Sequence, residues 1–317
     1  MESFGSILTT MLIVFGLIAV GFGCRKKGYT NDTFDGTLSK IVLNVALPAM
    51  ILNSVLKNDN LPDANTVLVL IVVPTIFLLS LCVLALVIVK VFFKQAPKKA
   101  QGVYAFTIIF GNTGFIGFPI VESLFGSDAV LYGALYNIPY NVLLFTVGIL
   151  LLSSGNEGAS KSKFSQIKEA LKTLINPANI SCFVAVFLVL FQITDHGFVG
   201  QFCQILGSII SPCALIIVGS TLAKAPLKRM IDDGRSFVVA IIRLLATPLL
   251  FYFVFGMFIA DPIMLASMTV VAATPVATVG TILCITHHGD VETMSKCTFL
   301  TTSLMLLTLP IIAMIVM

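Results

Sequence analysis

Charged residues are scarce in this chain of 317 residues. Asp, Glu, Lys and Arg together make up 11% of the sequence, against about 25% in an ordinary soluble domain. Hydrophobic residues account for 57%, and the mean hydropathy is +1.03. This composition excludes a soluble globular domain and predicts an all-α membrane protein that crosses the bilayer several times.

Motifs for metal binding and catalysis are also lacking. The seven cysteines have no Cys-x-x-Cys or metal-ligand spacing, so we interpret them as small packing residues. His287, His288 and Asp290 resemble a set of metal ligands, but a solvated turn is the simpler interpretation. The sequence shows no nucleophile–base set, phosphate loop or His-Glu-x-x-His helix. We therefore predict neither an enzyme nor a cofactor.

The few basic residues are concentrated in a small number of loops, so the net charge of +4 does not indicate a nucleic-acid partner. Arg25, Lys26 and Lys27 follow the first apolar stretch, which favours a first membrane span over a cleaved signal peptide. Basic residues also follow the third, fifth and seventh apolar stretches, whereas the opposite loops contain almost none. The positive-inside rule then places both termini on the outer side of the cell membrane.

Ten apolar segments are long enough to span a bilayer, for which about 17–25 residues are needed. An even number of spans agrees with termini that share one side. The predicted spans are residues 3–24, 35–56, 66–92, 100–124, 129–152, 177–194, 201–223, 236–259, 262–286 and 292–316.

A polar stretch at 153–176 divides the spans into two sets of five, at residues 1–152 and 177–317. It contains a basic, amphipathic pattern that fits either a helix on the inner leaflet or a simple linker. Prolines occupy comparable places in the two halves, in the pairs Pro48 and Pro212, Pro74 and Pro248, and Pro119 and Pro275. For Pro74 and Pro248 a packing kink is the simpler interpretation. The pattern predicts two inverted five-helix repeats, in which interrupted helices mark the binding site of a transporter.

The fourth and ninth spans carry the strongest signs of interruption. Residues Gly111–Pro119 combine three glycines, a proline, an amide and a hydroxyl inside an apolar segment. Broken helices expose backbone amides, and their N-terminal ends favour a carboxylate. The predicted binding residues are Asn112, Thr113, Gly114, Gly117 and Pro119 in the fourth span, with Thr274, Pro275, Thr278 and Gly280 in the ninth.

Other polar residues within the predicted spans are further candidates. Asn44 precedes Pro48, and Asn137 and Asn141 share one helix face, where they contact either a substrate or a neighbouring helix. Glu122 is a candidate for coupling to protons or cations, or is exposed at the outer surface. Arg243 either reaches back to the cytoplasmic interface or provides a countercharge to an anion.

The pattern Asn112-Thr113-Gly114-Phe115-Ile116-Gly117-Phe118-Pro119 resembles that of the auxin efflux carrier family, as do Leu47-Pro48-Ala49 and the Pro275 stretch. The resemblance covers the whole chain. It implies a scaffold domain and a transport domain, with spans 4 and 9 unwound and crossing at their prolines. It also implies elevator-type alternating access, with Asn112 contacting the carboxylate. Plant members often have a second proline in span 9 where this chain has Gly280, and their central loop is much longer.

The expected function is therefore a carrier of small organic anions, such as dicarboxylates or auxin-like monocarboxylates, working in the lipid bilayer. Two alternatives stay open. One is a sodium- or proton-coupled symporter or exchanger of bile-acid-transporter type, and the other is a membrane receptor that does not transport. The oligomeric state is not determined by the sequence, and a homodimer is compatible with it.

Overall fold

A computed structural model describes residues 4–155, 175–224 and 232–317. In these ranges the chain is helical, with no strand and a single isolated β-bridge, so the prediction of an all-α membrane protein is confirmed. The amphipathic pattern predicted within 153–176 lies almost entirely outside the described residues. The α-helices are α1 (Phe4–Lys26), α2 (Asp32–Ile41), α3 (Leu47–Leu56), α4 (Ala64–Phe92), α5 (Lys98–Ile109), α6 (Phe118–Phe125), α7 (Val130–Leu143), α8 (Ile149–Leu152), α10 (Pro177–Leu190), α11 (Phe198–Ser208), α12 (Ile210–Lys224), α14 (Gly234–Ile241), α15 (Thr247–Leu250), α16 (Pro262–Ala272), α17 (Val279–Thr286) and α18 (Val291–Val316).

Seven helical segments in the described residues are long and apolar enough to cross a membrane. They correspond to the predicted spans 1, 2, 3, 5, 7, 8 and 10. The other three predicted spans contain shorter helices. Span 6 is represented by α10, which has only 14 residues, and spans 4 and 9 are each divided into two helices by a non-helical stretch.

Wide helical turns accompany three of the prolines. The π-helical turns Val42–Ala46, Thr113–Gly117 and Ile242–Ala246 each end two residues before a proline, namely Pro48, Pro119 and Pro248. A proline lacks an amide donor, and its ring clashes with the carbonyl four residues earlier. Widening the turn before it relieves that clash and allows the helix to continue. The helix through Pro74 is continuous, without such a turn.

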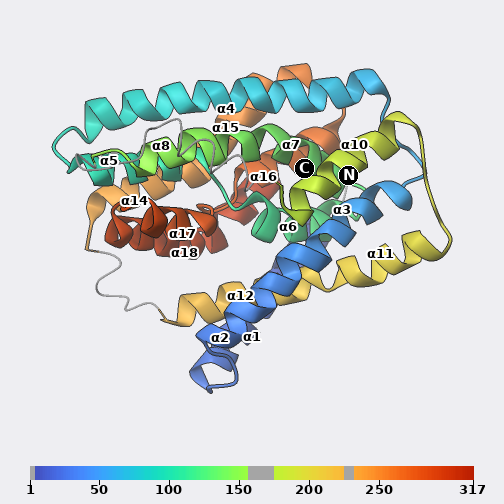
Figure 1. Ribbon diagram of the computed structural model, residues 1–317, viewed down its shortest axis with the longest axis horizontal. Helices are drawn as coiled ribbons and strands as arrows, with labels where there is room; N and C mark the ends of the chain where they lie inside the picture. The colour runs from blue at the N-terminus through green and yellow to red at the C-terminus, as the bar shows by residue number, and fades with distance from the viewer. Residues whose placement is uncertain (1–3, 156–174, 225–231) are drawn as a thin grey trace.

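Glycines bring α1 and α12 into close backbone contact (Figure 1). A Cβ atom added at Gly21 would lie 2.0 Å from the carbonyl oxygen of Ile216, and one at Gly219 would lie 1.9 Å from that of Ile18. Any larger residue would therefore separate the helices. Small residues that permit such contact are a common feature of helix pairs in membranes.

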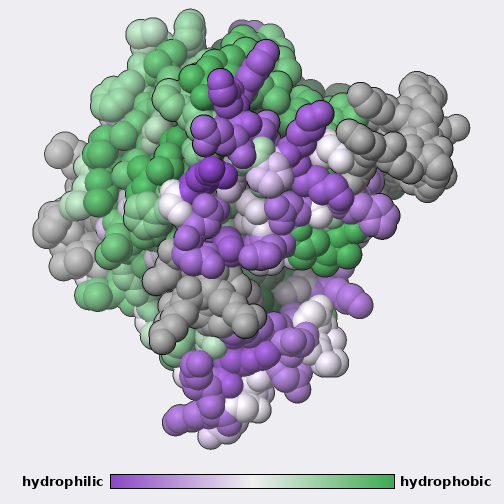
Figure 2. Space-filling view, turned by 90° about the vertical axis from the view of Figure 1, so that its left-hand side faces the viewer, coloured by the Kyte–Doolittle hydropathy of each residue, from purple (hydrophilic) through white to green (hydrophobic). Residues whose placement is uncertain are grey.

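A band of hydrophilic residues crosses one end of the molecule, next to hydrophobic surface (Figure 2). At this end the Asp32 carboxylate pairs with both Arg25 and Lys224 at 2.5 Å, which joins the ends of α1, α2 and α12. Asp233 caps α14 here and also accepts a hydrogen bond of 2.9 Å from the Tyr104 hydroxyl of α5. Burial opposes ionisation of Asp233, but hydrogen bonds from Ser236, Tyr104 and the backbone outweigh it and lower the pKa of its carboxyl.

Candidate functional site

The two interrupted segments meet at their non-helical stretches. The first, Phe110–Asn112, separates α5 from the π-helical turn that leads into α6, and the second, Ala273–Thr278, separates α16 from α17. Gly111 and Val276 form an antiparallel β-bridge. The amide of Asn112 donates to the carbonyl of Pro275 at 2.7 Å, and the amide of Ala277 donates to that of Phe110 at 3.0 Å. We call this pair of stretches the crossover.

The position of the first break differs from the prediction. The sequence placed the interruption across Gly111–Pro119, but the helix resumes at Thr113, and Pro119 lies within α6. The wide turn Thr113–Gly117 accommodates the proline, so the break needs only the three residues before it. In the ninth span Pro275 does lie within the unwound stretch, and Gly280 belongs to α17.

Arg243 stabilises the crossover from within the protein. Its side chain is 1% exposed, so it does not reach back to an interface. Nε donates to the carbonyl of Thr274 at 2.9 Å, and Nη1 donates to the carbonyls of Ile108 and Ile109 at 3.3 and 3.2 Å. The carbonyls of Ile108 and Ile109 lie at the C-terminal end of α5, and that of Thr274 lies just beyond the C-terminal end of α16, where helices carry partial negative charge. One guanidinium therefore neutralises both helix ends.

Gly111 is required by this arrangement. A Cβ atom at this position would lie 1.8 Å from Nη2 of Arg243 and 2.4 Å from Oγ1 of Thr274. Both neighbours are held by hydrogen bonds, since Thr274 Oγ1 also donates to the carbonyl of Val271 at 2.8 Å. The side chain of Arg243 thus packs directly against the backbone of the crossover.

Two helix N-termini also lie at the crossover. The segment that begins at Thr113 and α17, which begins at Val279, both start there. The amides of Ile116 and Gly117 bond to the carbonyl of Asn112, which leaves those of the preceding residues without an acceptor in the helix. Two N-termini with their partial positive charges provide a favourable environment for an anion.

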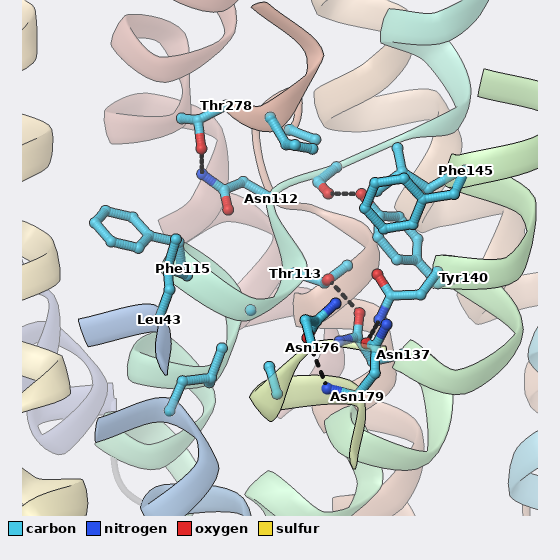
Figure 3. Close-up of a pocket in the computed structure, with 18 of the residues that line it drawn as sticks. Leu43, Asn112, Thr113, Phe115, Asn137, Tyr140, Phe145, Asn176, Asn179 and Thr278 are labelled. Carbon is cyan, nitrogen blue, oxygen red and sulfur yellow. Dashed lines mark hydrogen bonds between the residues drawn. The ribbon is translucent and has the colours of Figure 1, made fainter. Parts of the chain in front are cut away.

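A cavity of about 280 Å³ lies at these N-termini (Figure 3). No charged residue lines it among the residues that the structure describes. Its walls combine asparagine and threonine side chains with apolar ones. The lining residues are Leu43, Asn44, Leu47, Gly111, Asn112, Thr113, Gly114, Phe115, Asn137, Tyr140, Asn141, Leu144, Phe145, Asn176, Ala178, Asn179, Ala277, Thr278 and Val279.

The chain is similar to a known family of proteins over nearly its whole length. The model of a family described as membrane transport proteins matches residues 6–313. The chain belongs to this family. The resemblance to the auxin efflux carriers is thereby confirmed. The protein is a membrane transporter of that family.

Curated relatives match this family member over most of their length. An uncharacterized transporter from Methanothermobacter thermautotrophicus is 24% identical over 305 residues, covering 95% of this chain and 96% of the relative. Another, from Methanocaldococcus jannaschii, is 23% identical over 95% of this chain and 96% of the relative. A relative from Rhizobium meliloti, provisionally named a malonate transporter, is 24% identical over 84% of this chain and 82% of its own.

The transporter brings seven of the predicted residues together around the cavity. These are Asn44, Asn112, Thr113, Gly114, Asn137, Asn141 and Thr278. Asn112 Nδ2 donates to Thr278 Oγ1 at 3.4 Å, which links the two broken segments, and Thr113 Oγ1 donates to Asn137 Oδ1 at 2.7 Å (Figure 3). Asn44 instead donates to the carbonyl of Lys40 in its own helix, at 2.8 Å.

The remaining predicted residues do not line the cavity. Gly117, Pro119, Thr274, Pro275 and Gly280 shape the two broken segments around it. Arg243 lies behind the crossover. Glu122 lies in α6 and accepts a hydrogen bond of 2.5 Å from Ser211 of α12.

Several lining residues of the transporter were not predicted as part of the site. Asn176 and Asn179 come from the start of α10, which packs against α7 beside the cavity. Tyr140 donates a hydrogen bond from its hydroxyl to the carbonyl of Gly111. In the sequence Tyr140 adjoins Asn141 one turn after Asn137, and this polar spacing is the signal that could have identified it. Phe115, Phe145 and Leu43 carry no distinguishing signal in an apolar span.

Proposed function

We propose that this transporter is a carrier of small organic anions that binds a carboxylate at the crossover. The observation that supports this most strongly is the position of the uncharged cavity at two helix N-termini, lined by Asn112, Thr113 and Thr278. Neutral amides, hydroxyls and helix dipoles stabilise an anion without a permanent ion pair, so the anion can also be released. The name of the Rhizobium meliloti relative fits this class of substrate.

The proposal includes the architecture of the family resemblance, with ten spans in two inverted repeats and elevator-type movement of the crossover. The equivalent placing of the two breaks, in the fourth span of each half, supports the repeats. The cavity wall continues from the crossover along Leu144 and Phe145, toward the end where the basic loops lie. We infer from this an inward-facing state, with both termini on the outer side as the positive-inside rule predicts.

On the opposite side of the crossover, the contact between Glu122 and Ser211 joins α6 to α12. We include this contact in the proposal as part of the outer closure. A carboxyl at this place could couple closure to a proton, which leaves the direction of transport dependent on the ion gradient supplied.

Transport of labelled malonate into liposomes that contain the purified protein tests the proposal. We expect saturable uptake by the unmodified protein and a reduction of at least about tenfold for Asn112→Ala. The alanine removes a side chain that faces the cavity and links the two broken segments, and a hydrogen bond to a charged group is worth about 1.5–3 kcal/mol. Asn60→Ala, in the exposed loop between α3 and α4, serves as the control.

Three outcomes distinguish the proposal from its alternatives. If malonate uptake by Asn112→Ala equals that of the unmodified protein, the crossover is not the binding site. Uptake only in the presence of a sodium gradient would favour a sodium-coupled carrier. Absence of uptake across a broad panel of organic anions would contradict the carrier function itself.

A further inference from the structure

The wall of the cavity beside α10 contains a second cluster of amides. Asn137 and Asn141 come from α7. Asn176 and Asn179 come from the start of α10 and lie near Asn137 (Figure 3). Nδ2 of Asn141 donates to Oδ1 of Asn179 at 2.5 Å, and both side chains line the cavity. Asn179 is 5% exposed. The described part of this cluster contains no charged side chain.

Helix α10 starts at this cluster, and its first turn determines which donors are available. Residue 177 is a proline and has no amide hydrogen, while the amide of Asn179 donates to Oδ1 of Asn176 at 2.9 Å. The amide of Ala178, which also lines the cavity, has no acceptor within the helix. A third helix N-terminus, with its partial positive charge, therefore faces the same cavity.

Asn137 provides an independent indication that a ligand binds here. Its side chain is 5% exposed and lines the cavity, and its Oδ1 accepts the hydroxyl of Thr113. Its Nδ2 makes no hydrogen bond to any described residue. If the Asn137 amide were flipped, Oδ1 and Nδ2 would exchange places. In either orientation one polar atom of this nearly buried side chain has no partner among the described residues. Buried polar groups without a partner are uncommon in proteins.

We propose that Asn137, Asn141, Asn179 and the start of α10 form a second subsite that holds a second carboxylate of the bound anion. The inference rests on the proposed function, because it places the first carboxylate at Asn112 and Thr278. The two groups that indicate a ligand are Nδ2 of Asn137 and the amide of Ala178 at the start of α10. Both are donors, which stabilise an acceptor with negative charge. The Thr113–Asn137 hydrogen bond connects the two subsites and holds them at a fixed separation.

The test compares malonate, which has two carboxylates, with propionate, which has one and the same number of carbons. The measured quantity is the ratio of their apparent affinities, from competition with labelled uptake into liposomes. We expect the unmodified protein to prefer malonate by at least about tenfold. Asn179→Leu removes the polar wall, and Asn137→Asp keeps the acceptor for Thr113 but repels a dianion more than a monoanion. Each should reduce the preference by at least about tenfold.

Ser181→Ala is the matched control on α10, because Ser181 is buried and bonds to the carbonyl of Ala178 without lining the cavity. Its preference should equal that of the unmodified protein. If Asn179→Leu does not fold, the nearly isosteric Asn137→Asp still gives the result. An unmodified protein without a preference, or an unchanged preference in either variant, would overturn the second subsite. If both acids are transported and transport depends on Asn112, but the ratio of their affinities is the same in the variants as in the unmodified protein, only this inference fails. If neither acid is transported, the proposed function is rejected.

Discussion

Replacing Arg243 with methionine should abolish anion transport and lower the melting temperature of the purified protein. Three carbonyl groups at the ends of α5 and α16 would lose their charged donor. Hydrogen bonds to charged groups contribute about 1.5–3 kcal/mol each, and a buried acceptor left without a partner costs a similar amount. We expect a loss of at least about 3 kcal/mol in unfolding free energy, measured by thermal unfolding in detergent together with malonate flux.

Arg235→Met is the control in the same membrane span, since its side chain is exposed at the start of α14. Arg243→Lys should recover only part of the stability, because its donors are on one nitrogen and cannot reach both helix ends in the way a planar guanidinium does. A methionine variant with the flux and melting temperature of the unmodified protein would show that the crossover does not depend on this cation.

Substitution of Gly111 by alanine is expected to have an effect of similar size. The added methyl group would lie far inside contact distance of Arg243 and Thr274, and both are fixed by their own hydrogen bonds. The crossover would have to separate, which also breaks the backbone bonds to Pro275 and Phe110. We expect malonate flux at the background level and a lower melting temperature.

Gly16→Ala provides the comparison for this substitution. No atom lies within 4 Å of the position that its Cβ would occupy in α1. Alanine is also the better helix former, by about 1 kcal/mol, so this variant should keep its flux and melting temperature. Full activity of Gly111→Ala would contradict the close approach of Arg243 to the crossover.

The class of fold and part of the site could be predicted because they depend on local composition. The scarcity of charged residues predicts membrane helices, and Asn112, Thr113 and Thr278 stand out because polar residues and helix breakers are uncommon in apolar spans. The exact break could not be predicted. Proline marks a place where a regular helix is disfavoured, but the packing around it decides whether the chain unwinds or forms a wide π-helical turn. A wide turn precedes Pro119, whereas Pro275 lies in an unwound stretch.

Long-range contacts account for what the sequence did not indicate. From the sequence, Arg243 had two possible roles, at the cytoplasmic interface or as a countercharge to an anion. Its partners are instead the carbonyls of residues 108, 109 and 274, which no local pattern connects with it. Asn176 and Asn179 lie next to a polar linker, and only the meeting of α10 with α7 places them in the cavity. Such residues are identified by the tertiary structure alone.

The position of Arg243 has a consequence for how a membrane voltage would act on the carrier. No described acidic side chain pairs with this cation, and its hydrogen bonds require it to move with the crossover. If the crossover moves across the bilayer with a bound monoanion while the Glu122 carboxyl of α6 is protonated, the two charges cancel and the loaded step transfers no net charge. The empty carrier returns with one positive charge, which is worth about 2.3 kcal/mol per 100 mV for a complete crossing. With a monoanion, a current would then accompany the empty return step alone, whereas with a bound dianion such as malonate the loaded step would carry one net negative charge as well.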